Sequence, residues 1–477
     1  MAKDRIKNFS TGVIYSARIH CKVRRLIMTT NAGIARRKIS PFWGVELTGW
    51  GYYLNRTWLD VHDDLNATSL IVENGNQSIA IVSVDLMVIS SEFTLTVRQQ
   101  ISIATGIRPQ NILVSCTHTH NAPASEGLRG VGEVDPVYEA WAARETATSA
   151  ILAWQNRETV TISAGATAVS GITFNRTREN GPVDENATVL RVDRADNSTL
   201  AVVVGFQAHP TVATILRPRS VSRDAPGQIC DLIETAHPGC TAIYIQGACG
   251  DVNFLREFVT PERHEEPGKA VAEAVLKFMA YVEPLDTSII AASVATATIP
   301  TRRWTREEIA GDQAEARQRL NDKDVSGWRE SIGRAMTNRP DDMVARHGND
   351  EWKAVEAMCR FNVEWTELME KDLNDRPETL TTEIQALRIG NFGIVTNSSE
   401  FFTTLALDVR ARSSLPFLIL SCYSNGRIGY MPDAHDVERK TYAAYQSPKY
   451  CNQFPFTKTS GTTMVDAMVA RLDNVCE

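Results

Sequence analysis

Residues 111–123 read NILVSCTHTHNAP, and this stretch predicts the part of the fold around which the chain is arranged. The run Ile112–Val114 is short, apolar and rich in β-branched residues, which is typical of a buried strand. His118 and His120 follow closely, and the Asn and Pro after them would stop a helix. Because ligands and catalytic groups collect at the carboxyl ends of strands in open α/β sheets, we expect a site beside these histidines.

The composition favours a globular protein without a nucleic-acid partner. The chain has 477 residues, 43% of them hydrophobic, which suits either two to three domains or one large α/β unit. The net charge of −7 offers no surplus of positive charge for a phosphate backbone. No apolar run approaches the roughly 20 residues that a transmembrane helix needs.

The cysteines and the N-terminus bear on the cellular compartment. The nine cysteines are scattered and include no CxxC pair, which favours reduced thiols in a cytoplasmic protein over a disulfide framework. Residues 1–27 are basic and lack the apolar core of a signal peptide, so we expect an N-terminal extension, disordered or laid over the surface. A transit peptide over residues 16–27 is the less favoured interpretation.

The pattern of elements over residues 28–477 predicts an α/β fold, with a mixed sheet and helices packed on the sheets. Ser69–Glu73 and Ser78–Leu86 read as a hairpin, because Asn74-Gly75 between them is a strong turn signal. Residues 301–375 are charged and helix-prone, and we expect two or three helices there that form a lobe or lid. Further strands are predicted at 159–168, 187–192, 200–208, 241–246, 288–299, 379–389, 392–396 and 416–422, and helices at 92–104, 137–155, 225–236, 268–281 and 460–472.

Polar residues follow four of the predicted strand ends. They are His118 with His120, His209, Asp251 and Glu400. One such residue is usually a cap or a satisfied hydrogen-bonding group, but five would converge if the strands shared one edge. In an extended His-x-His segment both imidazoles lie on one face. Imidazoles with one carboxylate suit zinc with a position open for water, although the spacing alone does not prove a site.

The segment THTHNAP (117–123) resembles the THTHSGP segment of neutral ceramidases and their uncharacterised bacterial relatives. Further resemblances follow in the family's order over about residues 30–475. They lie at Ile34–Arg36 with Thr48–Gly51, Val82–Leu86, Asn175-Arg176, Phe206–Pro210, Gln246–Asn253, Ser399–Thr403 and Tyr430–Pro432 with Tyr442.

The resemblance implies one zinc ion per chain and assigns its ligands. They would be His118, His209, Glu400 and Tyr430. His120 would then handle protons beside the metal, together with Asp251. Arg176 and Tyr442 match residues that contact the scissile carbonyl, and they can donate to a developing oxyanion. We expect the aromatic loop with Trp50 to shape the substrate pocket, and Asn253 to be either a loop residue or a substrate contact.

The sequence also departs from the family pattern. Ceramide-cleaving members have Ser where this chain has Asn253, so a serine nucleophile is excluded there and a metal-activated water is preferred. Asn121-Ala122 replaces Ser-Gly, and Ser399 replaces Gly before Glu400. We also expect no immunoglobulin-like C-terminal domain, since the sequence ends at Glu477. These departures favour a small or soluble substrate over membrane ceramide.

The expected function is a zinc-dependent hydrolase that cleaves an N-acyl amide bond with water activated by the metal. A zinc-dependent ester or lactone hydrolase is an alternative, because the same chemistry serves both bonds. A non-catalytic zinc-binding protein is a second alternative, but structural zinc sites are usually closed and rich in cysteine. The expected partner is a small-molecule amide or ester, and a homo-oligomer remains open.

Overall fold

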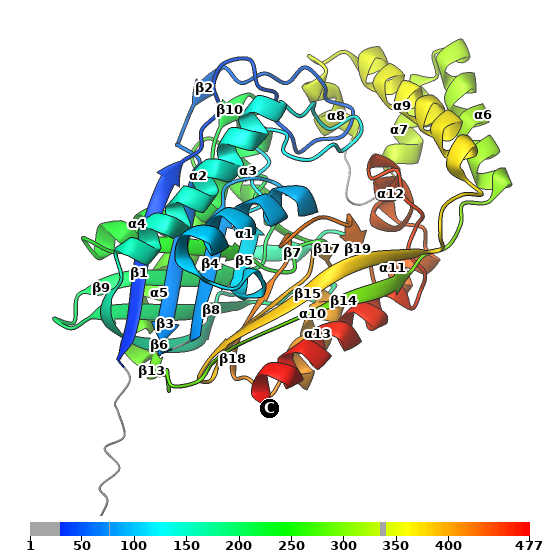
Figure 1. Ribbon diagram of the computed structural model, residues 1–477. Coiled ribbons are helices and arrows are strands. Elements are labelled where there is room, and N and C mark those ends of the chain that lie inside the picture. The colour runs from blue at the N-terminus through cyan, green and yellow to red at the C-terminus, as the bar shows by residue number, and fades with distance from the viewer. Residues whose placement is uncertain (1–28, 76, 334–339) are drawn as a thin grey trace, which may run out of the picture.

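The computed structural model describes residues 29–75, 77–333 and 340–477 (Figure 1). The predicted N-terminal extension, residues 1–27, lies outside the described residues. No helix in the described part of the chain is both long enough and apolar enough to cross a membrane.

The main sheet has nine strands in the order β11-β9-β8-β6-β1-β3-β4-β5, with β13 paired to β6. The β4–β5 and β9–β11 pairs are parallel and the other pairs are antiparallel, so the predicted mixed sheet is confirmed. Its strands are β1 (Thr30–Lys38), β3 (Asn66–Asn74), β4 (Gln77–Val84), β5 (Ile112–Cys116), β6 (Glu158–Ala168), β8 (Asn186–Arg194), β9 (Thr199–Phe206), β11 (Thr241–Gln246) and β13 (Glu283–Pro284).

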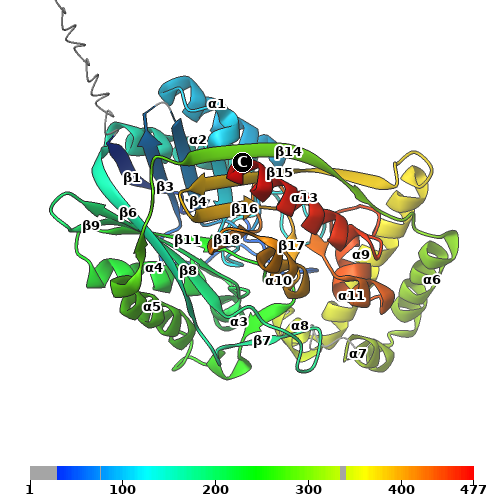
Figure 2. The ribbon, with the colours of Figure 1, turned by 90° about the horizontal axis from the view of Figure 1, so that it is seen from below.

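A second sheet of four strands packs against the inner face of the first (Figure 2). Its strands are β14 (Ile290–Pro300), β15 (Thr379–Ile389), β16 (Phe392–Thr396) and β18 (Phe417–Ser421). Leu113, Val203 and Ile419 belong to the apolar core between the sheets. The approach is close at Gly205, where an added Cβ would lie 2.8 Å from Ile419 Cγ1.

Helices cover the outer face of each sheet. On the main sheet these are α1 (Ser91–Thr105), α2 (Pro136–Gln155), α4 (Asp224–Ala236) and α5 (Glu266–Phe278). On the second sheet they are α10 (Thr403–Arg412) and α13 (Ser460–Cys476). The helix α2 lies directly on β1, because Gly33 has no side chain and a Cβ there would meet Ala153 O at 2.1 Å.

Short elements hold the loops at the strand ends. The strand pairs are β2 (Asp60–Val61) with β10 (Ser220–Val221), β7 (Thr173–Asn175) with β12 (Val252–Phe254), and β17 (Glu400–Phe401) with β19 (Tyr430–Met431). The helices are α3 (Val212–Leu216), α11 (Ala434–Glu438), α12 (Ser447–Tyr450) and the π-helical turn η4 (Tyr442–Gln446); the 3₁₀ turns are η1 (Pro109–Asn111), η2 (Arg256–Phe258) and η3 (Met279–Tyr281).

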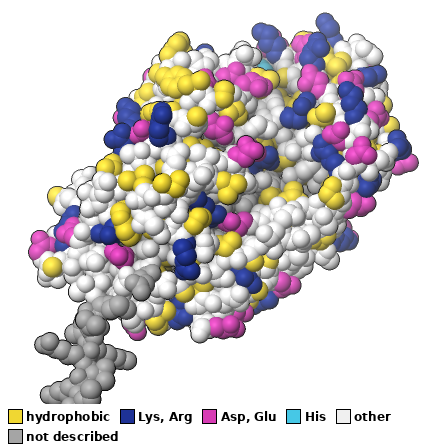
Figure 3. Space-filling view, viewed as in Figure 1, with side chains coloured by type: hydrophobic (Ala, Val, Ile, Leu, Met, Phe, Trp, Pro, Cys, Tyr) yellow, Lys and Arg dark blue, Asp and Glu magenta, His cyan; other side chains and the backbone are white. Residues whose placement is uncertain are grey.

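Residues 305–333 and 340–373 form a helical lobe beside the two sheets (Figure 1). The lobe packs around an apolar core that contains Trp328 and Trp365 and extends to Tyr52, Tyr450 and Phe454 outside the lobe. Positive and negative side chains are intermixed over it (Figure 3). The prediction of two or three helices was wrong, because the described residues of the lobe form four. They are α6 (Arg306–Asp322), α7 (Val325–Gly333), α8 (Pro340–Arg346) and α9 (Glu351–Asp372).

Candidate metal centre and active site

Three imidazoles meet at the carboxyl ends of strands β5 and β9. His118 Nε2 lies 3.1 Å from His209 Nε2 and 3.3 Å from His120 Nε2. The strands β5 and β11 end the main sheet at opposite sides, yet they contact each other because the sheet curves. The segment after β18 joins them, since Cys116 N donates to Tyr423 O and Cys422 N donates to Gln246 O. This curvature brings the strand ends together.

The main chain fixes where each imidazole carries its proton. The Nδ1 atoms of His118, His120 and His209 lie 2.9, 2.7 and 2.5 Å from the carbonyl oxygens of Met87, Gly49 and Cys249, in that order. A carbonyl oxygen only accepts, so each neutral ring holds its proton on Nδ1. The three Nε2 atoms therefore turn lone pairs toward one another.

Electrostatics keeps the rings of His120 and His209 neutral. Burial and the nearby Arg176 charge lower the pKa of His209 to about 3. Burial and the two neighbouring histidines lower the pKa of His120 well below its usual value. Neutral imidazoles are the form that binds a metal ion.

Glu400 completes a donor set that lacks a cation of its own. Its Oε2 lies 3.5 Å from His118 Nε2 and 3.3 Å from His209 Nε2. This buried oxygen accepts no hydrogen bond from the described residues. Burial raises the pKa of Glu400, and the lowering by His118 and His209 requires positive charge at their Nε2 atoms, which a bound cation would supply and the neutral rings do not. An ionised carboxylate facing imidazole lone pairs fits a divalent metal, and zinc accepts such donors.

Tyr430 and Arg176 stand beside this donor set. The parallel pair β17–β19 places Glu400 next to Tyr430. Arg176 Nη2 donates to Tyr430 Oη at 2.8 Å and to Gly250 O at 2.8 Å. Burial raises the pKa of Tyr430 well above its usual value. The structure brings Tyr430 to the centre, and its part as a ligand remains a prediction.

His118 has a backbone conformation that the sequence did not indicate. Its φ is 64°, in the left-handed region that costs a non-glycine residue free energy. Its ring stacks on Tyr423, with ring centres 3.8 Å apart. The expected extended His-x-His geometry was therefore wrong, although both rings still reach one site.

Asp251 has surroundings that differ from the expected proton-transfer position. Its Oδ1 accepts hydrogen bonds from the Thr403 backbone N and from Oγ1, both at 2.8 Å. Its Oδ2 accepts from Asn175 Nδ2 at 2.8 Å, and its backbone oxygen accepts from Arg176 N. The side chain is fully buried, and burial raises its pKa to about 6. These contacts tie the Arg176 loop to the start of α10 and indicate a structural role.

Cys249 is a neighbour of the centre that sequence reasoning did not single out. Its Sγ lies within 4.8 Å of ligand atoms of His118 and His209. It is 3.0 Å from Tyr423 Oη, and burial raises the pKa of the thiol well above its usual value. A protonated thiol is a poor metal ligand, so Glu400 is the better third donor.

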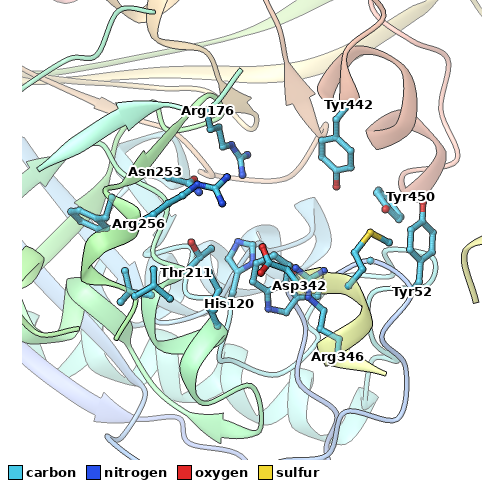
Figure 4. A pocket seen from close by; sticks show the side chains of 18 of the residues that line it. Tyr52, His120, Arg176, Thr211, Asn253, Arg256, Asp342, Arg346, Tyr442 and Tyr450 are labelled. Atoms are coloured by element: carbon cyan, nitrogen blue, oxygen red, sulfur yellow. The ribbon is translucent and has the colours of Figure 1, made fainter. Parts of the chain in front are cut away.

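A cavity of about 100 Å³ opens beside the imidazoles (Figure 4). His120, Arg176 and Tyr442 point into it, with Arg176 and Tyr442 across the space from His120. Trp50 and Asn253 also line the wall, and contact of either residue with a substrate remains a prediction. Residues that the sequence did not identify complete it, and they include Thr211, Arg256, Asp342, Arg346 and Tyr450.

Comparisons with known proteins identify the fold. No protein-family model and no curated protein matches the sequence. The structure is similar to that of neutral ceramidase from Pseudomonas aeruginosa, with a TM-score of 0.69 and 15% sequence identity, covering 94% of this chain and 75% of that chain. A ceramidase complexed with C2 gives a TM-score of 0.67 at 13% identity, with coverage of 93% and 75%. The chain therefore has a ceramidase-like fold, as the short sequence motifs predicted.

Proposed function

We propose that this protein is a zinc-dependent hydrolase that cleaves N-acyl amide bonds with water, and that it binds one zinc ion per chain. The carrying observation is the ionised Glu400 carboxylate facing the Nε2 lone pairs of His118 and His209, with no cation from the described chain between them. The ceramidase-like fold supports the choice of an amide bond.

The proposed ligands are His118, His209 and Glu400, with Tyr430 as the fourth. When bound, zinc supplies a water of lowered pKa and polarises a carbonyl group. The backbone carbonyls that hold each Nδ1 proton keep the rings in the orientation and tautomer that such an ion requires.

The residues around the cavity have separate tasks in this proposal. His120 is neutral and has Nε2 free of a proton, so this atom can accept a proton and pass it to the leaving nitrogen. Arg176 and Tyr442 lie across the cavity and can donate hydrogen bonds to the oxyanion that forms. Burial opposes the charge of Arg176, but Tyr430 and Glu400 outweigh it and raise its pKa, so this donor remains charged.

The size of the cavity supports a compact substrate. About 100 Å³ is well below the roughly 300–1,000 Å³ of typical small-molecule pockets. Trp50, Tyr442 and Tyr450 close its walls. A short or soluble amide therefore suits the space better than a long lipid.

The test combines metal analysis with a substrate panel. Metal-free protein should be inactive, and zinc should restore hydrolysis of short N-acyl amides. His118→Ala and His209→Ala should lose both metal and turnover, whereas His237→Ala, at the end of α4, should keep both. Full activity without metal would refute the proposal. The panel also contains a matched series of esters and lactones. If the protein cleaves these and none of the amides, it is an ester or lactone hydrolase and the amide assignment is wrong.

A further inference from the structure

The cavity differs in charge from the rest of the chain. The chain carries a net charge of −7. The described residues that line the cavity include three arginines, Arg176, Arg256 and Arg346, against one carboxylate, Asp342. A cationic cavity in an acidic protein indicates an anionic ligand group.

Arg346 is the cavity arginine whose charge has no hydrogen-bonding or ionic partner among the described residues. Arg176 is engaged by Gly250 O and Tyr430 Oη. The guanidinium of Arg346 lies over the ring of Trp50, 3.6 Å from its centre. Among residues 29–75, 77–333 and 340–477 it has no hydrogen bond and no ion pair, although Asp342 is one helical turn earlier on α8.

The surroundings of Arg346 make an anionic partner favourable. Burial lowers the pKa of Arg346 to about 10, and the charge of Asp342 offsets this only in part. The guanidinium is thus still charged at neutral pH but has lost much of its hydration. An incoming carboxylate would restore hydrogen bonds to this charge, and such charge-assisted pairs are the strong ones.

Arg346 also lies near the proposed reaction centre. The Trp50 ring contacts both groups: it meets His120 edge-on with ring centres 5.6 Å apart, and it carries the Arg346 guanidinium on its face. Figure 4 shows Arg346 and Asp342 on the same side of the cavity as His120. An anionic group held there would be close to a bond that His120 serves.

We propose that the cavity selects short amides that carry a carboxylate, such as N-acyl amino acids, and that Arg346 is the residue that recognises the carboxylate. This inference rests on the proposed amide hydrolysis. The compact cavity favours a carboxylate over a bulkier anion.

The experiment compares two short substrates that differ only in the carboxylate, N-acetylalanine and the matching N-ethylacetamide. For the wild-type protein we expect kcat/KM to favour the carboxylate by about tenfold to hundredfold. Arg346→Met should bring this ratio close to one, and Arg346→Lys should retain part of the preference. A wild-type ratio near one, or an unchanged ratio in Arg346→Met, would overturn the inference.

Controls separate recognition from folding and from the chemistry. Asp342→Asn should keep or increase the preference, because it removes the negative charge beside Arg346. Lys353→Met, at an exposed lysine outside the cavity, should leave the ratio unchanged. Each variant is first checked for metal content and thermal unfolding. If Arg346→Met does not fold, the kcat/KM ratio of Arg346→Lys for the two substrates decides the test. A ratio in Arg346→Lys equal to that of the wild type would count against the inference.

Binding measurements distinguish failure of the inference from failure of the proposed function. Calorimetry with both compounds on the metal-loaded protein needs no turnover. Tighter binding of N-acetylalanine than of N-ethylacetamide, lost in Arg346→Met, would support anion recognition even if no amide in the panel were cleaved. Cleavage of both amides with equal binding would refute anion recognition and leave the proposed hydrolase intact.

Discussion

Two groups of residues that line the cavity are held in place in different ways. The wall with the imidazoles comes from strand ends, and its side chains are fixed by main-chain carbonyls in a buried core. Arg346 and Asp342, on the same side of the cavity, come from α8 of the helical lobe, a seven-residue helix whose apolar core also includes Tyr52 and Tyr450. The difference suggests that the sheets provide the chemistry and the lobe provides selectivity, and variants on either side can test this division.

The largest effect is expected from Glu400→Ala on the sheet side. It removes a proposed ligand. Loss of a residue that only hydrogen-bonds to a metal ligand lowers metal affinity by up to about 100-fold, so the fall in zinc affinity here should be larger. Zinc titration of metal-free protein measures this. Glu364→Ala, an exposed glutamate on α9, is the matched control and should bind zinc as the wild type does. Unchanged affinity in Glu400→Ala would remove Glu400 from the proposed centre.

His120→Gln should lower kcat by about 10²–10⁴-fold while the protein keeps its zinc. The Gln side chain can occupy the space of the imidazole ring, but it does not transfer protons. The variant should also lose the limb of the pH–rate profile that belongs to His120. Loss of zinc in this variant would instead make His120 a ligand.

Trp328→Ala tests the lobe side. Trp328 is fully buried and packs in the lobe core, so its loss should destabilise the lobe by about 3–5 kcal/mol. Because none of the proposed zinc ligands belongs to this core, zinc binding should persist while the preference among substrates weakens. Proteolysis confined to the lobe, with unchanged zinc content, would support separate roles for the sheets and the lobe. Loss of zinc together with proteolysis of the lobe would contradict them.

The smallest effect is expected from Asp251→Asn. The Asn side chain would place an N–H group opposite donors from which the carboxylate now accepts hydrogen bonds. This should lower the free energy of unfolding by about 1–3 kcal/mol. Thermal unfolding measures this cost. The pH–rate profile should keep its shape, in contrast to His120→Gln. Loss of one limb of the pH–rate profile in Asp251→Asn would instead support a role for Asp251 in proton transfer.

The sequence predicted local elements well. Strands β11, β15 and β16 have the predicted bounds, because each is an apolar run with clear turn signals at its ends. Strand β1 was not predicted, since TNAGIARRK has only weak alternation and is held in place by β3, β6 and α2. Its stability comes from tertiary contacts that a local pattern does not contain.

The candidate site was predicted in part. Convergence of His118, His209 and Glu400 was expected from strand ends, and the structure places them together. The sheet curvature that achieves it depends on contacts between β5 and β11, far apart in the sequence. Arg346 could not be identified, because only the packing of α8 over Trp50 brings it to the cavity.

The loop that carries Trp50 also carries the carbonyl of Gly49, to which His120 donates its Nδ1 proton. A side chain at position 49 would lie 2.7 Å from His120 Cβ, so the main chain must come this close. One peptide unit thus links the ring under Arg346 to the acceptor that fixes the tautomer of His120. A ligand that shifts Trp50 would change the basicity of His120 Nε2, so substrate identity would be read out as turnover rate as well as affinity.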